Sequence, residues 1–337
     1  MDLQLLEETL AARGEPRFRA RQVWAWAARG ARGYDEMTDL PATLRERLAN
    51  ELPFSSLTLR DEARASDGTV KALFATSDGR ALEAVLMRYR DGRRSICLSS
   101  QSGCPLTCTF CATGQMKFAR NLTASEIVDQ ALHFHRMQRG TERLTNCVFM
   151  GMGEPMLNLD NVLAACERLP DLGIGHRHTA ISTVGWIPGI EALAEQDMPL
   201  RLALSLHAAD EALRSELMPV NDRYPLGDVV EACRDFYARK RRRVFVEYVM
   251  LRGVNDRYEQ ALALARLLAG GRSGERPIFK VNLIPYNPTS SPYEGSTRAS
   301  IAAFRDALLA HGIPATVRLT RGRDIDAACG QLAARAD

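Results

Sequence analysis

The chain has 337 residues, 46% of them hydrophobic and 25% charged, with a formal net charge of +3. These values predict a globular protein with one large and one smaller domain, and so small a net charge does not by itself indicate nucleic-acid binding. No apolar run is long enough to span a bilayer, and the acidic segment 1–8 does not resemble a signal peptide. We therefore expect a cytoplasmic protein with no membrane association.

Residues 1–55 are predicted to form a helical accessory domain, because apolar residues recur at helical spacing. Six arginines and one glutamate fall within residues 12–32, and Trp24 and Trp26 lie between the arginines. This combination of cations and aromatic rings favours contact with the backbone and bases of RNA. The alternative is a solvated helix face above two core tryptophans.

Residues 56–94 are predicted to form a small β-meander extension, because apolar and polar residues alternate along two runs. The dipeptides Asp67-Gly68, Asp78-Gly79 and Asp91-Gly92 are typical of tight turns between antiparallel strands. Glu83 lies within one of these strands. On its position alone, it is one of a row of outward-facing residues.

From residue 95 onward, strand-like apolar runs alternate with helix-like runs. The strand-like runs are 95–100, 145–150, 178–183, 200–206, 244–251 and 278–284. The helix-like runs are 123–139, 159–169, 188–195, 225–240, 257–269 and 297–311. Six βα units predict a parallel sheet, so we expect an α/β fold with a partial (β/α)6 barrel of the TIM type over residues 95–290. Residues 291–337 would add a helix, a strand and a tail that carries Cys329.

Three cysteines occupy one short loop, Cys104-Pro-Leu-Thr-Cys108-Thr-Phe-Cys111. Three thiolates can hold three irons of a [4Fe–4S] cluster, and the fourth iron is then open to a small molecule. A zinc site or three unrelated thiols are the alternatives. The chain has no second Cys-x-x-Cys pair, which structural zinc sites commonly use. The spacing therefore favours the cluster.

Polar and glycine-rich residues follow several of the predicted strands, where a βα barrel gathers its reactive groups. These residues are Gly153, Glu154, Ser182, Ser205, His207 and Asn287. The glycine lets the backbone approach a ligand, Glu154 can accept the ammonium of a bound amino acid, and the hydroxyls and amide can bind a ribose or a carboxylate. We expect His207 to contact a cofactor through its backbone. Ordinary βα turns are the alternative.

Two further cysteines lie in polar, loop-like sequence. Cys97 is on the strand that enters the cysteine loop, and Cys329 is in the tail, which Gly322 and Gly330 would allow to bend back over the barrel. Their positions leave a paired redox role open. The other three cysteines fall in apolar runs and are predicted to be packing residues: Cys147, Cys166 and Cys233.

Together these segments resemble the dual-specificity radical S-adenosylmethionine (SAM) enzymes that methylate C2 of adenine in 23S rRNA and in tRNA. The similar segments are 97–114, 120–123, 151–155, 205–207, 284–288 and 320–332. The resemblance implies a [4Fe–4S] cluster on Cys104, Cys108 and Cys111. The implied SAM site comprises Gly153, Glu154, Ser182, Ser205, Leu206, His207 and Asn287. Cys329 would carry a methyl group, Cys97 would be its resolving partner and Glu83 the general base.

The resemblance also implies the chemistry, because the electron-poor C2 of adenine does not attack a methyl donor as a nucleophile. One SAM would methylate the Cys329 thiolate, and the reduced cluster would cleave a second SAM to a 5′-deoxyadenosyl radical that removes hydrogen from this methyl group. The resulting carbon radical would add to C2. After the adduct loses an electron and Glu83 removes a proton, Cys97 would attack the Cys329 sulfur and release the base, leaving a Cys97–Cys329 disulfide.

The implied partners are 23S rRNA, tRNA and an electron donor such as flavodoxin or ferredoxin, and the chain would act as a monomer. An antibiotic-resistance relative that methylates C8 of adenine shares the cysteines and the radical chemistry, so the sequence leaves C2 and C8 open, although the N-terminal helices and the tail favour C2. A non-catalytic zinc RNA-binding protein and a radical SAM enzyme of small molecules are more distant alternatives.

Overall fold

A computed structural model of the chain describes residues 1–138, 140–269 and 277–334. Its main sheet has ten strands in the order β1-β2-β3-β4-β7-β8-β9-β10-β11-β12. The strands are β1 Leu57–Arg64, β2 Val70–Thr76, β3 Ala81–Arg88, β4 Arg94–Cys97, β7 Asn146–Phe149, β8 Thr179–Thr183, β9 Arg201–Ser205, β10 Val244–Met250, β11 Phe279–Pro285 and β12 Ala315–Val317. β1 to β4 pair antiparallel, and every later neighbouring pair is parallel.

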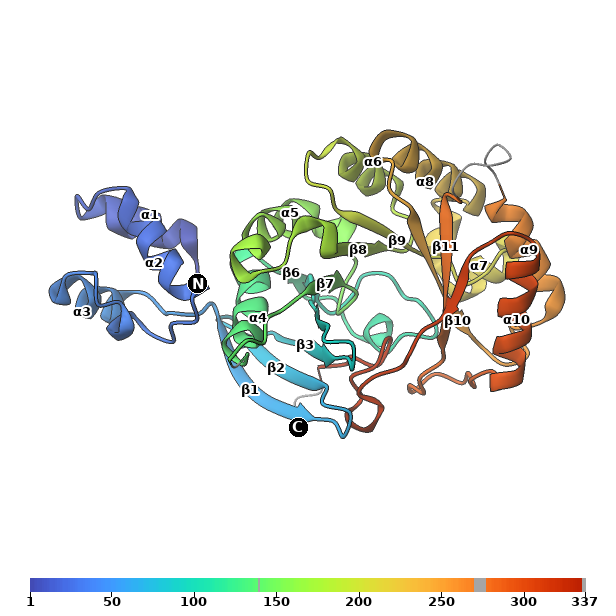
Figure 1. Cartoon of the computed structure of the whole chain (residues 1–337), viewed down its shortest axis with the longest axis horizontal. Helices are drawn as coiled ribbons and strands as arrows, with labels where there is room; N and C mark the ends of the chain where they lie inside the picture. The colour runs from blue at the N-terminus through green and yellow to red at the C-terminus, as the bar shows by residue number, and fades with distance from the viewer. Residues whose placement is uncertain (139, 270–276, 335–337) are drawn as a thin grey trace.

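Helices cover the outer face of the parallel strands (Figure 1). They are α4 Ala124–Arg136, α5 Leu159–Arg168, α6 Ile187–Glu195, α8 Leu226–Lys240, α9 Tyr258–Leu268 and α10 Arg298–Ala310. The short helix α7, Glu211–Leu217, instead lies against the loops that follow β8 and β9. The predicted α/β fold with a partial barrel is confirmed, because the sheet runs from β1 to β12 without closing. The short helix α7 and the two-residue strands β5 (Gln101–Ser102) and β6 (Arg120–Asn121) were not predicted.

The meander extends the barrel sheet and is not a separate layer, since β3 pairs with β4. Each predicted Asp-Gly turn has its glycine at positive φ: Gly68 at 83°, Gly79 at 77° and Gly92 at 89°. A residue with a Cβ would be strained there, which is why the dipeptide predicted the turns. Through this pairing the meander brings Val85 opposite Cys97.

The N-terminal helices α1 (Leu3–Ala12), α2 (Phe18–Ala28) and α3 (Ala42–Glu51) lie to one side of the barrel (Figure 1). Trp24 is buried, and its Nε1 donates a hydrogen bond to Asp171 Oδ2 at 2.7 Å. Trp24 is therefore a packing residue between α2 and the barrel, and it is not available to stack on a base. Trp26 is half-buried beneath the guanidinium of Arg29, 4.5 Å from its ring centre.

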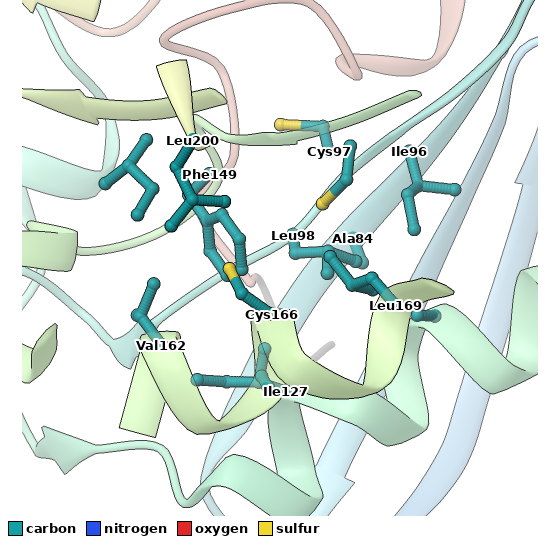
Figure 2. Packing of buried hydrophobic residues seen from close by; sticks show 14 of the residues in the cluster. Ala84, Ile96, Cys97, Leu98, Ile127, Phe149, Val162, Cys166, Leu169 and Leu200 are labelled. Carbon is teal, nitrogen blue, oxygen red and sulfur yellow. The ribbon is translucent and has the colours of Figure 1, made fainter. Parts of the chain in front are cut away.

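Buried apolar side chains join the sheet to helices α4 and α5. Figure 2 shows Leu98, Phe149 and Leu200 of the strand side facing Val162 and Cys166 of α5, with Leu169 and Ile127 beside them. Cys147, Cys166 and Cys233 are fully buried, as their apolar surroundings predicted. This packing fixes the strands, and so it fixes the loops at their carboxyl ends. In the described part of the chain, no helix has the length and apolar character needed to cross a membrane.

Candidate active site

The cysteine loop leaves the sheet after β4 and rests on α7. The backbone N–H of Thr109 donates to the carbonyl of Leu217 at 3.0 Å, and the side-chain amide of Gln115 donates to the carbonyl of Cys108 at 3.1 Å. A Cβ at Gly114 would lie 2.8 Å from the same carbonyl, so only glycine lets the loop fold back so closely. The loop is therefore a fixed turn that holds its three thiols near one another.

The surroundings of these thiols fit a metal cluster. Burial raises the pKa of Cys104 to about 12, and burial, with Cys111 and Cys104 nearby, raises the pKa of Cys108 well above its usual value. Such thiols stay protonated until a metal displaces the proton. In the chain as described, no three His, Cys, Asp or Glu side chains converge on a single ion. A [4Fe–4S] cluster does not need its cysteine sulfurs to converge on one point, because each cysteine binds a different iron.

One cavity, here called the cofactor cavity, opens at the carboxyl ends of β7 to β11. Five residues singled out from the sequence line it, together with Cys111 and Cys329: Gly153, Glu154, Ser182, Ser205 and His207. Gly153 has φ of 93°, and a Cβ there would lie 2.4 Å from the Cβ of Gln101, so glycine is required. The hydroxyl oxygens of Ser182 and Ser205 lie 3.3 Å apart and form one polar patch on the wall.

Glu154 is a buried carboxylate with no cationic partner among the described residues. Its oxygens accept hydrogen bonds from the backbone N–H groups of Met156 at 3.1 Å and Val184 at 3.0 Å. Burial raises the pKa of Glu154 to about 7 despite these bonds. A buried carboxylate that lines a cavity is suited to bind a ligand cation, such as the ammonium of an amino acid.

His207 is held neutral in the cavity wall. Burial, and secondarily the charge of Arg214, lowers the pKa of His207 to about 3. Its Nδ1 accepts from the backbone N–H of Val249 at 3.0 Å, and its carbonyl accepts from the amide of Asn255 at 2.9 Å. The residue has φ of 60°, a left-handed conformation held by these contacts. His207 therefore shapes the wall, and with so low a pKa it stays neutral and is a poor base near neutral pH.

Leu206 and Asn287, the other two residues of the expected SAM site, do not line the cofactor cavity. Leu206 is fully buried, and its backbone N–H donates to the carbonyl of Glu247 at 3.1 Å. The side-chain amide of Asn287 donates to the carbonyl of Cys329 at 3.2 Å. In this conformation Asn287 therefore holds the tail.

A second cavity, here called the cysteine cavity, adjoins the first. Cys97, Cys329 and Asn287 line it, and Cys111, Cys329 and Arg318 line both cavities. Cys97 and Cys329 are free thiols. Burial, reinforced by the neighbouring Cys329, raises the pKa of Cys97 to about 12. The structure thus brings together the two cysteines whose pairing the sequence left open.

The tail reaches this place through hydrogen bonds to the cysteine loop. The backbone N–H of Ala112 donates to the carbonyl of Gly330 at 2.8 Å, and the hydroxyl of Thr113 donates to the carbonyl of Leu332. Because Ala112 and Thr113 follow Cys111 directly, the loop that would hold the cluster also positions Cys329.

Arg318 and Glu247 are site residues that the sequence reasoning missed. Nη1 of Arg318 lies 3.3 Å from Oε2 of Glu247, and Arg318 lines both cavities. The pKa of Arg318 is raised mainly by the neighbouring Cys329 and to a smaller extent by Glu247. A carboxylate within the apolar strand β10 was an available signal for Glu247. No pattern singled out Arg318, which follows β12 directly.

Glu83 lies outside both cavities. It is buried, and its carboxylate pairs with Lys71 Nζ at 2.9 Å and accepts from the backbone N–H groups of Ala333 at 2.9 Å and Ala334 at 3.0 Å. It borders a separate hollow with Lys71 and Asp326. In this conformation the Glu83 carboxylate accepts hydrogen bonds from the tail, so Glu83 anchors the tail.

Comparison with known proteins places the chain among methyltransferases. Residues 98–265 match the model of the radical SAM superfamily, and residues 1–52 match that of the ribosomal RNA large subunit methyltransferase N-terminal domain. The crystal structure of a radical SAM methyltransferase from Sphaerobacter thermophilus is 47% identical, with a TM-score of 0.93, over 99% of this chain and 98% of that one.

Two curated relatives match over nearly the whole length. A probable dual-specificity RNA methyltransferase RlmN from Chloroflexus aurantiacus is 49% identical over 99% of this chain and 92% of its own length. The dual-specificity RNA methyltransferase RlmN of Anaeromyxobacter sp. is 45% identical over 99% of this chain and 89% of its own length. The chain therefore belongs to the RlmN family of dual-specificity RNA methyltransferases, radical SAM enzymes that use a [4Fe–4S] cluster and SAM.

Proposed function

We propose that the protein methylates C2 of an adenine in 23S rRNA and of an adenine in tRNA anticodon loops, with Cys329 as the methyl carrier. One observation supports this above all: Cys329 lies between the cofactor cavity and the buried Cys97, and it lines both cavities. A methyl-carrying thiol needs access to a methyl donor on one side and to a resolving thiol on the other. Both are available at this position.

The cluster and the cofactor are assigned to separate groups of residues. Cys104, Cys108 and Cys111 hold the cluster, and the residues that line the cofactor cavity bind SAM, with Glu154 on its ammonium group. When bound, this pair supplies a 5′-deoxyadenosyl radical, and SAM also supplies the methyl group. Leu206 contributes its backbone, and Asn287 joins the SAM site when the tail moves.

The chain's own cysteines carry the substrate through the reaction. The Cys329 thiolate accepts the methyl group by displacement at carbon, with Arg318 stabilising its negative charge. Once the methyl carbon is bonded to adenine C2 and the adduct has lost one electron and the C2 proton, the Cys97 thiolate attacks the Cys329 sulfur. The sulfur–carbon bond breaks, the released carbon takes up a proton to become the methyl group, and a disulfide remains. An external reductant such as a thiol must restore both thiols. Glu83 acts as general base after the tail releases it.

The RNA substrate requires an accessible adenine, in a loop or flipped out of its stack. The exposed arginines of α2 and of the segments that flank it supply positive charge for its phosphates. They are Arg13, Arg17, Arg21, Arg29 and Arg32. We further propose that the protein acts as a monomer and takes its electrons from a flavodoxin or a ferredoxin.

The test is nucleoside analysis by mass spectrometry. Anaerobically reconstituted enzyme, with SAM and a reductant, should convert one adenosine of a 23S rRNA fragment and one of a tRNA anticodon stem-loop to 2-methyladenosine. Formation of 8-methyladenosine would overturn the assignment to C2. A protein that contains zinc and no iron would overturn the radical chemistry itself.

A further inference from the structure

Arg214 is an arginine buried completely beneath the site. It lies on α7, and its side chain is fully inaccessible to solvent. Its guanidinium donates to three neutral acceptors: the carbonyl of Val184 at 2.6 Å, the carbonyl of Leu206 at 3.3 Å and Oδ1 of Asn221 at 2.5 Å. These bonds hold its position between the loops that follow β8 and β9.

The positive charge of Arg214 is not balanced by a contacting carboxylate. Within the described residues, no carboxylate oxygen lies within 4.0 Å of its nitrogens. Glu211 is nearby, but its Oε2 accepts from the amide of Asn221 at 2.7 Å and does not contact the guanidinium. Burying a cation with only neutral partners costs free energy, so we expect a negatively charged group to bind close to Arg214.

The group beside this charge is the cysteine loop. Cys108 packs against Leu217 and Met218 at the end of α7, and Thr109 is hydrogen-bonded to Leu217. Arg214 and Cys108 therefore belong to two segments, α7 and the cysteine loop, that pack against each other here. A thiolate-bound cluster at Cys108 is the negative charge that would complete this environment.

We propose that Arg214 is the fixed counter-charge of the iron–sulfur cluster and that it favours the reduced form. The inference rests on the assignment of Cys108 as a cluster ligand. Reduction adds a negative charge to the cluster, and a nearby positive charge in a poorly solvated site stabilises that charge. The same residue ties the SAM-site loops at Val184 and Leu206 to the cluster loop. It acts as a positioning residue and does not touch substrate.

The experiment compares Arg214→Met, Arg214→Lys and the control Arg223→Met in anaerobically reconstituted full-length protein. Arg223 is exposed and lies over the ring of Trp186, so its removal tests the general loss of a nearby cation. The readouts are iron and sulfide content and the midpoint potential of the cluster, followed by electron paramagnetic resonance. Arg214→Met should lower the reduced-to-oxidised ratio at a fixed potential about tenfold, equivalent to about −59 mV for one electron.

Arg214→Lys should stay close to the wild-type potential because it keeps the charge, and Arg223→Met should not shift it. An unchanged potential in Arg214→Met, or an equal shift in Arg214→Lys, would overturn the proposal. Failure of the wild-type protein to take up iron would instead count against the proposed function.

If Arg214→Met does not fold, the double change Glu211→Gln with Asn221→Asp provides a second test. It moves one carboxylate onto the guanidinium, where Asn221 Oδ1 already accepts a hydrogen bond, and leaves the net charge unchanged. The potential should again become more negative, because the charge of Arg214 is then neutralised locally. A potential equal to that of the wild type would contradict the inference.

Discussion

The two cavities that meet at Cys329 are built in different ways. The walls of the cofactor cavity follow directly after β7, β8 and β9, and parallel strands flank each of these on both sides. The cysteine cavity is closed by residues 318–334, which contain only the three-residue turn Arg323–Ile325 and are held by scattered hydrogen bonds. The cofactor cavity is therefore part of the rigid scaffold, whereas Cys329, the proposed methyl carrier, lies on a segment that can move without unfolding the sheet.

Removal of the proposed methyl carrier should abolish methyl transfer and affect the cleavage of SAM much less. Cys329→Ala should reduce RNA methylation by on the order of 10³-fold or more, since the nucleophile is lost. Reductive cleavage of SAM, which depends on the cofactor cavity, should persist in part. Product counting by mass spectrometry measures both. The control Cys166→Ala changes a buried cysteine of α5 and should leave methylation in place. Normal methyl transfer by Cys329→Ala would remove this residue from the mechanism.

Replacement of Cys97, which lies on β4, should have a different result from replacement of Cys329. In Cys97→Ala the RNA should become attached to Cys329 and stay there, because no thiol attacks the sulfur to release it. Denaturing gels should show a covalent protein–RNA species that is absent in Cys97→Ala combined with Cys329→Ala. Ordinary multiple turnover by Cys97→Ala would mean that another group releases the product.

Arg318 lines both cavities beside Cys329, so its replacement tests how the Cys329 thiol is activated. Arg318→Met should slow methylation of the Cys329 thiol by about 10- to 100-fold, because the guanidinium no longer stabilises the thiolate. Arg318→Lys should retain part of the rate. Mass spectrometry of the tail peptide after a single exposure to SAM measures this step without RNA. Equal rates in all three proteins would assign Arg318 to structure alone.

The cofactor cavity should respond to pH through Glu154. Since burial raises its pKa to about 7, the carboxyl is ionised only above this pH in the free protein. SAM should therefore bind more weakly as the pH falls below 7, by up to about tenfold per unit. Glu154→Gln should bind SAM weakly and with little pH dependence. Calorimetric titration would check the binding, and a wild-type affinity that does not change with pH would contradict this role.

The raised pKa of Glu154 also predicts that the free protein loses stability as the pH rises from 4.5 towards 7.

The smallest expected effect concerns the anchor of the tail. Glu83→Gln should weaken the two hydrogen bonds from the backbone of Ala333 and Ala334 by about 1 kcal/mol in total. Hydrogen exchange at these two amides should then be faster, while exchange in β8 and β9 stays unchanged. Protection equal to that of the wild type would show that Glu83 is not what holds the tail.

The elements of the barrel were predictable because each depends on local pattern. Buried strands such as Val244–Met250 are mostly apolar runs bounded by turn residues. Helix α4 begins after the N-cap Thr123 with a capping box, whose hydrogen bonds the structure contains. Helix α7 was missed, although Asp210 caps it, because seven residues are too few for a clear helical period. It is nevertheless the element on which the cysteine loop rests.

The sequence predicted the placement of some residues of the candidate site and not of others. Gly153, Glu154, Ser182 and Ser205 follow strands, and the common direction of parallel strands explains why they meet at one cavity. The same reasoning placed Asn287 beside them, but in the structure its side chain holds the tail. Trp24 is similar: its charged neighbours suggested a nucleic-acid surface, and its ring is buried against the barrel.

The sequence by itself determined the loop of three cysteines, the succession of βα units and hence the fold, because spacing and periodicity act over a few residues. Only the tertiary structure decided that Cys329 lies beside Cys97 and Arg318, and that the tail covers Glu83. Ala333 and Glu83 are 250 positions apart, and no local pattern encodes their contact. Such contacts depend on the summed packing of the whole barrel, which sets where the tail can return.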